Sequence, residues 1–186
     1  MDAFDTDLPG VRVFEPDVYT DHRGAFMEVW NARTYRRHGL AATFVQDNLS
    51  RSKEGVLRGL HFQNPRPQGK LISVVQGAVY DVVVDVRAGA DTFGAWHGTA
   101  LSAENARQLY VPEGYAHGFV VTSGPALFHY KCTDFYHPEA DQTVRWDDPQ
   151  IGIDWPVRDP LLSEKDAKAP CLAEMDRESL RFDDAR

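Results

Sequence analysis

Cysteine, positive charge and long apolar runs are all scarce in this chain. Only two cysteines occur, Cys132 and Cys171, without CxxC spacing, which argues against a disulfide framework or a zinc site and favours a reducing compartment. Lysine and arginine number 20 against 28 aspartates and glutamates, giving a formal net charge of −8. A general affinity for nucleic acid is therefore excluded, because that binding depends on a basic surface. An anionic small molecule remains a possible ligand, since a pocket can concentrate positive charge locally.

No apolar run approaches the roughly 20 residues that are needed to span a bilayer. Segment 1–7 is acidic and lacks the cationic and apolar regions of a signal peptide. We therefore expect a cytoplasmic protein without membrane partners. At 186 residues and 42% hydrophobic, the chain has the size and composition of one globular domain. We expect that domain to cover 1–186, with 172–186 as a loose acidic tail.

Short apolar segments separated by glycine and proline dominate the chain. We expect strands at 10–15, 25–30, 44–50, 71–75, 78–86, 94–101, 108–111, 119–122 and 126–136. Gln76-Gly77 is expected to turn a hairpin, and Ser123-Gly124-Pro125 to separate the last two strands. One helix is indicated at 32–38, capped by Asn31 and ended by Gly39. This pattern predicts an all-β jelly-roll barrel with a few short peripheral helices.

One stretch places polar groups where a buried strand is expected. Arg58, Gly59 and His61 lie within apolar sequence, and Lys70 follows a few residues later. Burying such groups unpaired would be costly, so they need partners. Arg58 and His61 are three residues apart and would face opposite sides of a regular strand. If both serve one pocket, Gly59 must host a bulge or bend, which we predict.

The turn at 112–117 resembles the P-x-G-x-x-H turn of the cupins, whose metal-binding members gather histidines and a glutamate. A metal would need three or four convergent ligands. Here His61 is followed by Phe62-Gln63 rather than by a second histidine, and Lys70 lies near the position that would supply the glutamate. An ammonium group beside a dication is repulsive, so we expect a barrel without metal.

An imidazole and an ammonium in one pocket are suited to enolisation. His61 can move protons near neutral pH, and Lys70 can stabilise the oxyanion that forms beside the broken C–H bond. Asp166 is a candidate to orient the imidazole, and Tyr130 to return a proton on the opposite face. Simpler alternatives stay open. Asp166 could complete a capping box with Ser163, Tyr130 could be a packing residue, Lys70 could be solvated and His117 could bond within its own turn.

Several motifs in order over about 13–170 make the chain similar to the dTDP-4-dehydrorhamnose 3,5-epimerases, cupin-fold enzymes that act on a sugar nucleotide. They are Asp21-x-Arg23-Gly24-x-Phe26-x-Glu28, Gln46-Asp47-Asn48-x-Ser50, Leu57-Arg58-Gly59-Leu60-His61-Phe62-Gln63, Asp81-Val82-Val83-Val84-Asp85-Val86-Arg87, Pro112-Glu113-Gly114-Tyr115-Ala116-His117-Gly118-Phe119 and Asp154-Trp155-Pro156. The resemblance implies epimerisation of dTDP-4-dehydro-6-deoxy-D-glucose at C3 and C5.

The resemblance also implies a role for each matching residue. His61 would be the base, Asp166 its partner, Tyr130 the opposite acid and Lys70 the group that faces the C4 oxygen. The residues implied to bind the substrate are Arg23, Glu28, Gln46, Asn48, Arg58, His117, Tyr136, Asp141 and Lys165. Tyr136 would stack on the thymine, and Asp141 stands where the family more often carries glutamate. Without the resemblance, Glu28 is either a carboxylate at a strand edge or a pocket residue paired with Arg23.

The resemblance further implies a homodimer, no metal and no organic cofactor. In such a dimer Arg23 and Glu28 would act across the interface. Three other functions stay open: an epimerase that inverts only one centre or a related ketoisomerase, a non-catalytic cupin that binds a sugar or nucleotide, and a metal-dependent cupin oxygenase. Tyr130 argues against the ketoisomerase, and the presence of both His61 and Tyr130 argues against the binding module.

Overall fold

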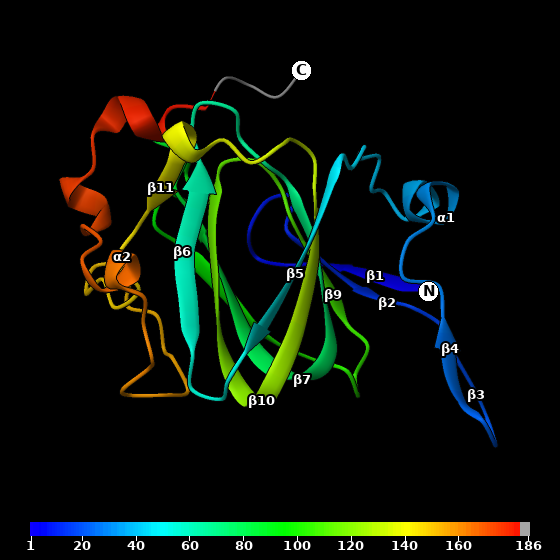
Figure 1. The fold of residues 1–186 in the computed structure, drawn as a ribbon. Coiled ribbons are helices and arrows are strands. Elements are labelled where there is room, and N and C mark those ends of the chain that lie inside the picture. The colour runs from blue at the N-terminus through cyan, green and yellow to red at the C-terminus, as the bar shows by residue number, and fades with distance from the viewer. Residues whose placement is uncertain (183–186) are drawn as a thin grey trace.

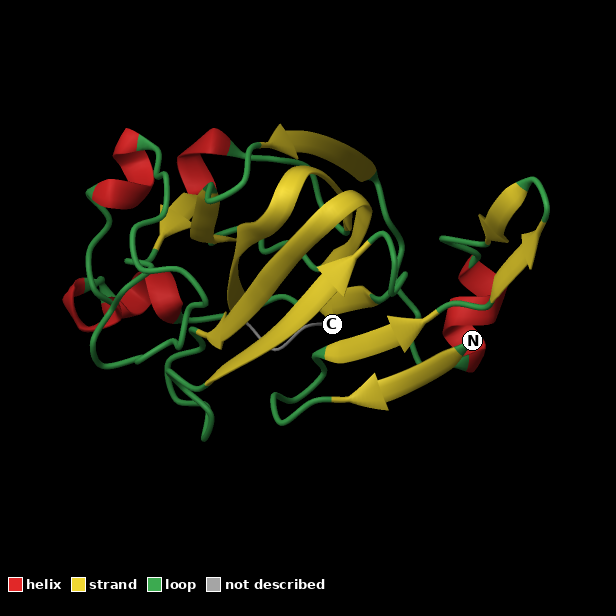
Figure 2. Ribbon diagram, turned by 90° about the horizontal axis from the view of Figure 1, so that it is seen from below, coloured by secondary structure: helices red, strands yellow, loops and turns green. Residues whose placement is uncertain are grey.

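Two long strands, β7 (Lys70–Asp85) and β10 (Tyr115–Cys132), form the centre of the structure, a computed structural model that describes residues 1–182 (Figure 1). The short helices lie outside the strands (Figure 2). The other elements are β1 (Asp2–Asp5), β2 (Arg12–Glu15), β3 (Val18–Asp21), β4 (Gly24–Met27), α1 (Ala32–Arg37), β5 (Gln46–Ser52), β6 (Leu57–Gln63), β8 (Trp96–Ser102), β9 (Gln108–Val111), η1 (Pro138–Ala140), β11 (Asp141–Thr143), α2 (Glu164–Ala167), η2 (Leu172–Glu174) and η3 (Arg177–Leu180).

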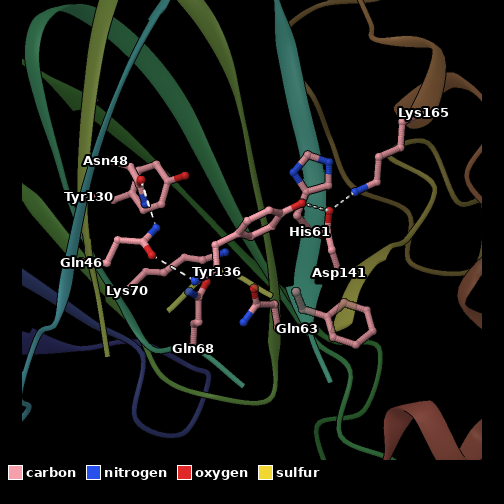
Figure 3. A pocket seen from close by; sticks show the side chains of 11 residues that line it. Gln46, Asn48, His61, Gln63, Gln68, Lys70, Tyr130, Tyr136, Asp141 and Lys165 are labelled. Atoms are coloured by element: carbon pink, nitrogen blue, oxygen red, sulfur yellow. Dashed lines mark hydrogen bonds and ion pairs between the residues drawn. The ribbon is translucent and has the colours of Figure 1, made fainter. Parts of the chain in front are cut away.

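Each long strand contributes to two layers, because its two halves have different neighbours. In β7, residues 70–73 pair with β9 whereas residues 78–84 pair with β8. In β10, residues 126–132 pair with β5 whereas residues 117–120 pair with β6. All of these pairings are antiparallel, and the all-β jelly-roll prediction is confirmed. The cavity drawn in Figure 3 opens between β5 and β6.

The two predicted turns inside these strands are wrong. Gln76-Gly77 lies within β7 and Ser123-Gly124-Pro125 lies within β10, where register shifts bring Ser123 opposite Ala78 and Leu127 opposite Gln76. Gly77 has φ +77°, and a Cβ there would lie 2.6 Å from the Ser123 carbonyl oxygen. Glycine and proline mark a bulge in a continuous strand as readily as they mark a turn, so local sequence does not separate the two.

Apolar side chains from both layers fill the barrel. Ile72, Val79, Leu109 and Phe128 are among the buried members of the main cluster. The predicted helix is confirmed as α1, whose N-cap Asn31 accepts hydrogen bonds from two backbone N–H groups. Among residues 1–182, no helix has the length and apolar character needed to cross a membrane.

The expected loose tail is wrong over residues 172–182, while residues 183–186 lie outside the described part. Leu172 in η2 and Leu180 in η3 are only 6% and 2% exposed and belong to a second core cluster with Val86. The Leu180 carbonyl accepts a hydrogen bond of 2.7 Å from the Ala88 backbone N–H. The acidic residues of this segment occupy exposed positions. Burial of the two leucines holds the segment against the barrel.

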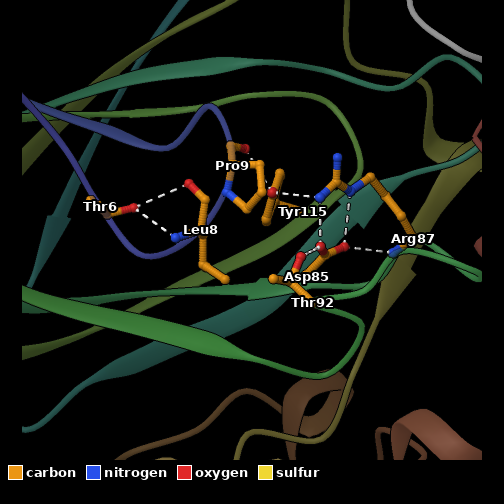
Figure 4. Close-up of polar contacts among 7 residues, drawn as sticks. All are labelled: Thr6, Leu8, Pro9, Asp85, Arg87, Thr92 and Tyr115. Carbon is orange, nitrogen blue, oxygen red and sulfur yellow. Dashed lines mark hydrogen bonds and ion pairs between the residues drawn. The ribbon is translucent and has the colours of Figure 1, made fainter.

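A buried carboxylate joins the N-terminal loop to one end of the barrel (Figure 4). Asp85 is fully buried and accepts hydrogen bonds from the Arg87 guanidinium, at 2.6 and 3.0 Å, and from the Thr92 hydroxyl at 2.6 Å. Arg87 also donates to the Tyr115 hydroxyl, which donates in turn to the Pro9 carbonyl at 2.8 Å. These hydrogen bonds therefore hold the loop between β1 and β2 against the end of the barrel.

Replacing Asp85 by asparagine should lower the free energy of unfolding by about 3 kcal/mol, because removing one partner leaves the other charge uncompensated. Urea unfolding measures this change. Asp147→Asn is the matched control, because the Arg145–Asp147 ion pair lies at the surface, where exposed pairs contribute little. Equal destabilisation by the two substitutions would show that the buried Asp85 contributes no more to stability than a surface carboxylate.

Candidate active site

The main pocket has a volume of about 340 Å³ and collects side chains from both layers. Gln46, Asn48, His61, Lys70, Tyr130, Tyr136, Asp141 and Lys165, which sequence analysis selected, all line it. Figure 3 shows His61 and Tyr130 on opposite sides of the pocket. The register of the sheet explains part of this arrangement, since Tyr130 on β10 lies opposite Asn48 on β5.

His61 is oriented by a buried carboxylate. Its Nε2 lies 2.6 Å from Oδ1 of Asp166, whose side chain is 3% exposed. Burial alone would raise the pKa of Asp166, but the hydrogen bonds from His61 and Ser163 outweigh it and hold that pKa below its usual value. Ser163 does cap α2 through the Asp166 backbone N–H. The Asp166 side chain nevertheless bonds to His61, so a capping role alone does not describe it.

The predicted irregularity at Gly59 is confirmed. His61 lies opposite His117 and Arg58 lies opposite Phe119, so three steps along β6 match two steps along β10. Gly59 has φ +140°, and a Cβ there would lie 2.5 Å from Cα of Gly118. This close approach requires glycine.

Arg58 differs from the expectation of a buried side chain in the same pocket. It is exposed and donates a hydrogen bond of 2.9 Å to the Ser52 hydroxyl. It lines an adjoining cavity of about 290 Å³, which it shares with His61, Lys165 and Asp166. Arg58 therefore lies beside the main pocket, in the adjoining cavity that it shares with His61.

Lys70 and Tyr130 reach the pocket from the two central strands. Burial lowers the pKa of Lys70, so its ammonium group releases a proton more readily than that of an exposed lysine. Burial raises the pKa of Tyr130, so its phenol stays protonated at neutral pH. Tyr130 also packs against Phe128, with ring centroids 6.0 Å apart. It is therefore both a packing residue and a pocket residue.

Tyr136, Asp141 and Lys165 form the rim of the pocket (Figure 3). Asp141 accepts hydrogen bonds from the Tyr136 hydroxyl at 3.1 Å and from Lys165 Nζ at 2.5 Å. The Tyr136 backbone N–H donates to the Gln46 side chain at 2.9 Å. These bonds hold the Tyr136 ring across the opening, where 53% of the residue remains exposed.

Besides Arg58 and Asp166, which line only the adjoining cavity, three of the selected residues lie outside the pocket. His117 is 7% exposed, lies opposite His61 in the pairing of β10 with β6 and bonds to Asp81 at 2.9 Å. Arg23 lies on the β3–β4 hairpin and pairs with Asp21, not with Glu28. Glu28 instead accepts hydrogen bonds from Asn31 and from the Thr34 hydroxyl at the start of α1. Of the two alternatives for Glu28, the pocket residue paired with Arg23 is therefore wrong within one chain.

Three polar residues in or near the site were not predicted from the sequence. Gln63 and Gln68 line the pocket, and Asp81 is the fully buried partner of His117. Asp81 gave a usable signal, because a carboxylate within a run of valines needs a buried partner. The two glutamines carried no comparable signal, since neutral amides are common on any loop or strand end.

The arrangement provides an oriented base, a cation and a phenol around one cavity. Such a set can remove a proton beside a carbonyl, stabilise the enolate and return a proton from the other side. Among residues 1–182, no three histidine, cysteine, aspartate or glutamate side chains converge as metal ligands would. A barrel without metal remains a prediction.

Nearly the whole chain is similar to proteins of one known family. The family model described as dTDP-4-dehydrorhamnose 3,5-epimerase matches residues 5–174. The dTDP-4-dehydrorhamnose 3,5-epimerase of Methanothermobacter thermautotrophicus is 54% identical, covering 87% of this chain and 89% of that protein. The solved dTDP-6-deoxy-D-glucose-3,5-epimerase of Legionella pneumophila, in complex with dTDP-4-keto-L-rhamnose, superposes with a TM-score of 0.95 at 48% identity over 99% of both chains. A 3'-monoepimerase from Streptomyces bikiniensis with dTDP-quinovose superposes with a TM-score of 0.88 at 36% identity, covering 95% of this chain and 90% of that one.

Proposed function

The chain belongs to the dTDP-4-dehydrorhamnose 3,5-epimerase family, and on that basis we propose which of its residues carry out the reaction. The enzyme is an isomerase that converts dTDP-4-dehydro-6-deoxy-D-glucose into dTDP-4-dehydro-L-rhamnose by inverting C3 and C5. The observation that carries the assignment of roles is the His61–Asp166 pair on one side of the pocket with Tyr130 on the other.

His61 takes the proton from the carbon beside the C4 ketone. Because Nε2 bonds to Asp166, Nδ1 is the nitrogen left for the substrate, and Asp166 stabilises the imidazolium that forms. The electron pair of the broken C–H bond moves to the C4 oxygen, where Lys70 stabilises the enolate. Tyr130 then gives its proton to the same carbon from the opposite face, which inverts the centre. These steps move only protons, so they need no cofactor.

The nucleotide part of the substrate lies at the rim in this proposal. Tyr136 stacks on the base, and Lys165 and Arg58 supply positive charge to the diphosphate from either side of His61. Gln46, Asn48 and Asp141 complete the polar lining. His117 does not line the pocket and bonds to Asp81, so its role is indirect.

A homodimer forms part of the proposal. The β3–β4 hairpin extends away from the barrel and exposes 65% of Tyr19 and 71% of Phe26 (Figure 1). Exposed aromatic residues of this size are typical of protein–protein contacts. A second copy that packed against this hairpin would place its pocket close to Arg23 and Glu28 of the first copy. A cytoplasmic location likewise remains a prediction.

Incubation with dTDP-4-dehydro-6-deoxy-D-glucose in heavy water should give a product with two deuteria, one at C3 and one at C5. Each inversion replaces a substrate hydrogen by one from solvent, because the returning proton comes from an exchangeable phenol. Mass spectrometry and proton NMR measure the label at each position. One deuterium would indicate a single-centre epimerase like the Streptomyces bikiniensis relative, and unlabelled sugar would indicate a binding protein.

A further inference from the structure

Lys70 depends on its backbone for its position in the pocket. Within the part of the chain that the structure describes, Nζ forms no hydrogen bond, and burial is the main influence on its pKa, which it lowers. Because the four-carbon stem of lysine is flexible, the backbone that carries it sets the region that its ammonium group can reach. The placement of residues 69–70, at the start of β7, therefore decides where the ammonium group lies.

Thr133 holds this backbone from the neighbouring strand end. The Gly69 backbone N–H donates to the Thr133 hydroxyl at 2.8 Å, and the Thr133 backbone N–H donates to the Gly69 carbonyl at 3.0 Å. Lys70 is itself paired with Cys132, the residue before Thr133. Gly69 is buried with no spare room, since a Cβ would lie 3.1 Å from both Cγ2 of Thr133 and the hydroxyl oxygen of Tyr110.

Glu113 fixes the direction of the Thr133 hydroxyl. That hydroxyl donates to Oε1 of Glu113 at 2.6 Å, and since a hydroxyl has one hydrogen, its lone pairs are then left for the Gly69 N–H. Glu113 lies in the turn at 112–117 and lines a second cavity of about 440 Å³ together with Tyr110 and Thr133. Glu113 does not line the main pocket, and its hydrogen bond to Thr133 is the contact that links it to the backbone of Lys70.

We propose that Glu113 and Thr133 are positioning residues for Lys70, acting through two successive hydrogen bonds to the backbone that carries it. The inference rests on the proposed role of Lys70 at the C4 oxygen. It gives a function to Glu113 in the turn at 112–117, since this residue does not line the main pocket.

Thr133→Val tests the first link, because valine keeps the shape and removes the hydroxyl. We expect kcat to fall by about 10- to 100-fold. A displacement of a catalytic group by up to about 1 Å has an effect of this size. KM should stay within about twofold, since the nucleotide contacts lie on other elements. Thr133→Ser, which keeps the hydroxyl, is the matched control and should retain the wild-type kcat.

A double-mutant cycle with Lys70→Ala separates positioning from general damage. In the Lys70→Ala background, Thr133→Val should have no further effect on the rate of deuterium uptake. The same fold-loss in both backgrounds, or an unchanged kcat in Thr133→Val alone, would overturn the inference. Wild-type turnover by Lys70→Ala alone would instead refute the proposed role of Lys70, which distinguishes the two failures.

Glu113→Ala and Glu113→Gln test the second link and serve if Thr133→Val does not fold. Glutamine keeps an oxygen acceptor for the Thr133 hydroxyl, whereas alanine removes it. We expect Glu113→Ala to lower kcat without changing KM, and Glu113→Gln to restore most of the rate. Equal rates for these two variants would overturn the assignment of Glu113.

Discussion

His61→Ala should lower turnover by about 10³-fold or more, at the upper end of what a positioned general base contributes. Alanine removes the only imidazole that both lines the pocket and bonds to a carboxylate among residues 1–182. Because both centres use the same base, deuterium uptake at C3 and at C5 should disappear together. Substrate turnover and NMR of the recovered sugar in heavy water measure the two effects.

Two controls keep the His61 result interpretable. Binding of dTDP should survive in His61→Ala, because Tyr136 and Lys165 lie at the rim and do not depend on the imidazole. Asp166→Asn should show a smaller loss in the same direction, since it leaves the base in place without its charged partner. Normal deuterium uptake by His61→Ala would remove this residue from the mechanism.

Tyr130→Phe should reduce product formation by about 10²-fold or more, because it removes the acid that completes inversion. Phenylalanine keeps the ring that packs against Phe128, so the pocket should keep its shape. His61 can still remove a proton and return one to the same face. The variant should therefore exchange substrate hydrogen with solvent faster than it forms epimerised product.

The ratio of exchange to inversion is the decisive quantity for Tyr130. Tyr136→Phe is the matched control, since within residues 1–182 its hydroxyl bonds only to Asp141 at the rim. That variant should weaken substrate binding and leave the ratio unchanged. A Tyr130→Phe enzyme in which exchange and inversion fall by the same factor would argue that Tyr130 is not the acid.

Most of the chemistry in the pocket was predictable from sequence, because local signals and motifs agreed. His61 and Lys70 stood out as polar groups in apolar sequence, and the three-residue spacing of Arg58 and His61 predicted the bulge at Gly59. Asp166 was a candidate from its chemistry, with a capping role as the alternative, and the resemblance favoured it as the partner of His61. Its contact with His61 joins residues 105 apart, which no local pattern reports.

The errors arose where long-range packing decides a local conformation. Gly77 and Pro125 mark turns by composition, yet the two strands bulge side by side and continue. Leu172 and Leu180 lie in acidic sequence, yet the barrel buries them. Glu28 lies in a motif that predicts a site residue, but within one chain it accepts hydrogen bonds from the start of α1. In each case the deciding partner is distant in the sequence.

The sharing of β7 and β10 by both layers has a consequence for how the barrel comes apart. A layer made of its own strands could open while the other stayed intact. Here either layer can separate only if the same two strands release their hydrogen bonds, since β7 and β10 pair along residues 70–85 and 115–132. Amide protons in the two halves of each strand should therefore exchange through one shared opening, and the barrel should lose its structure in a single cooperative step.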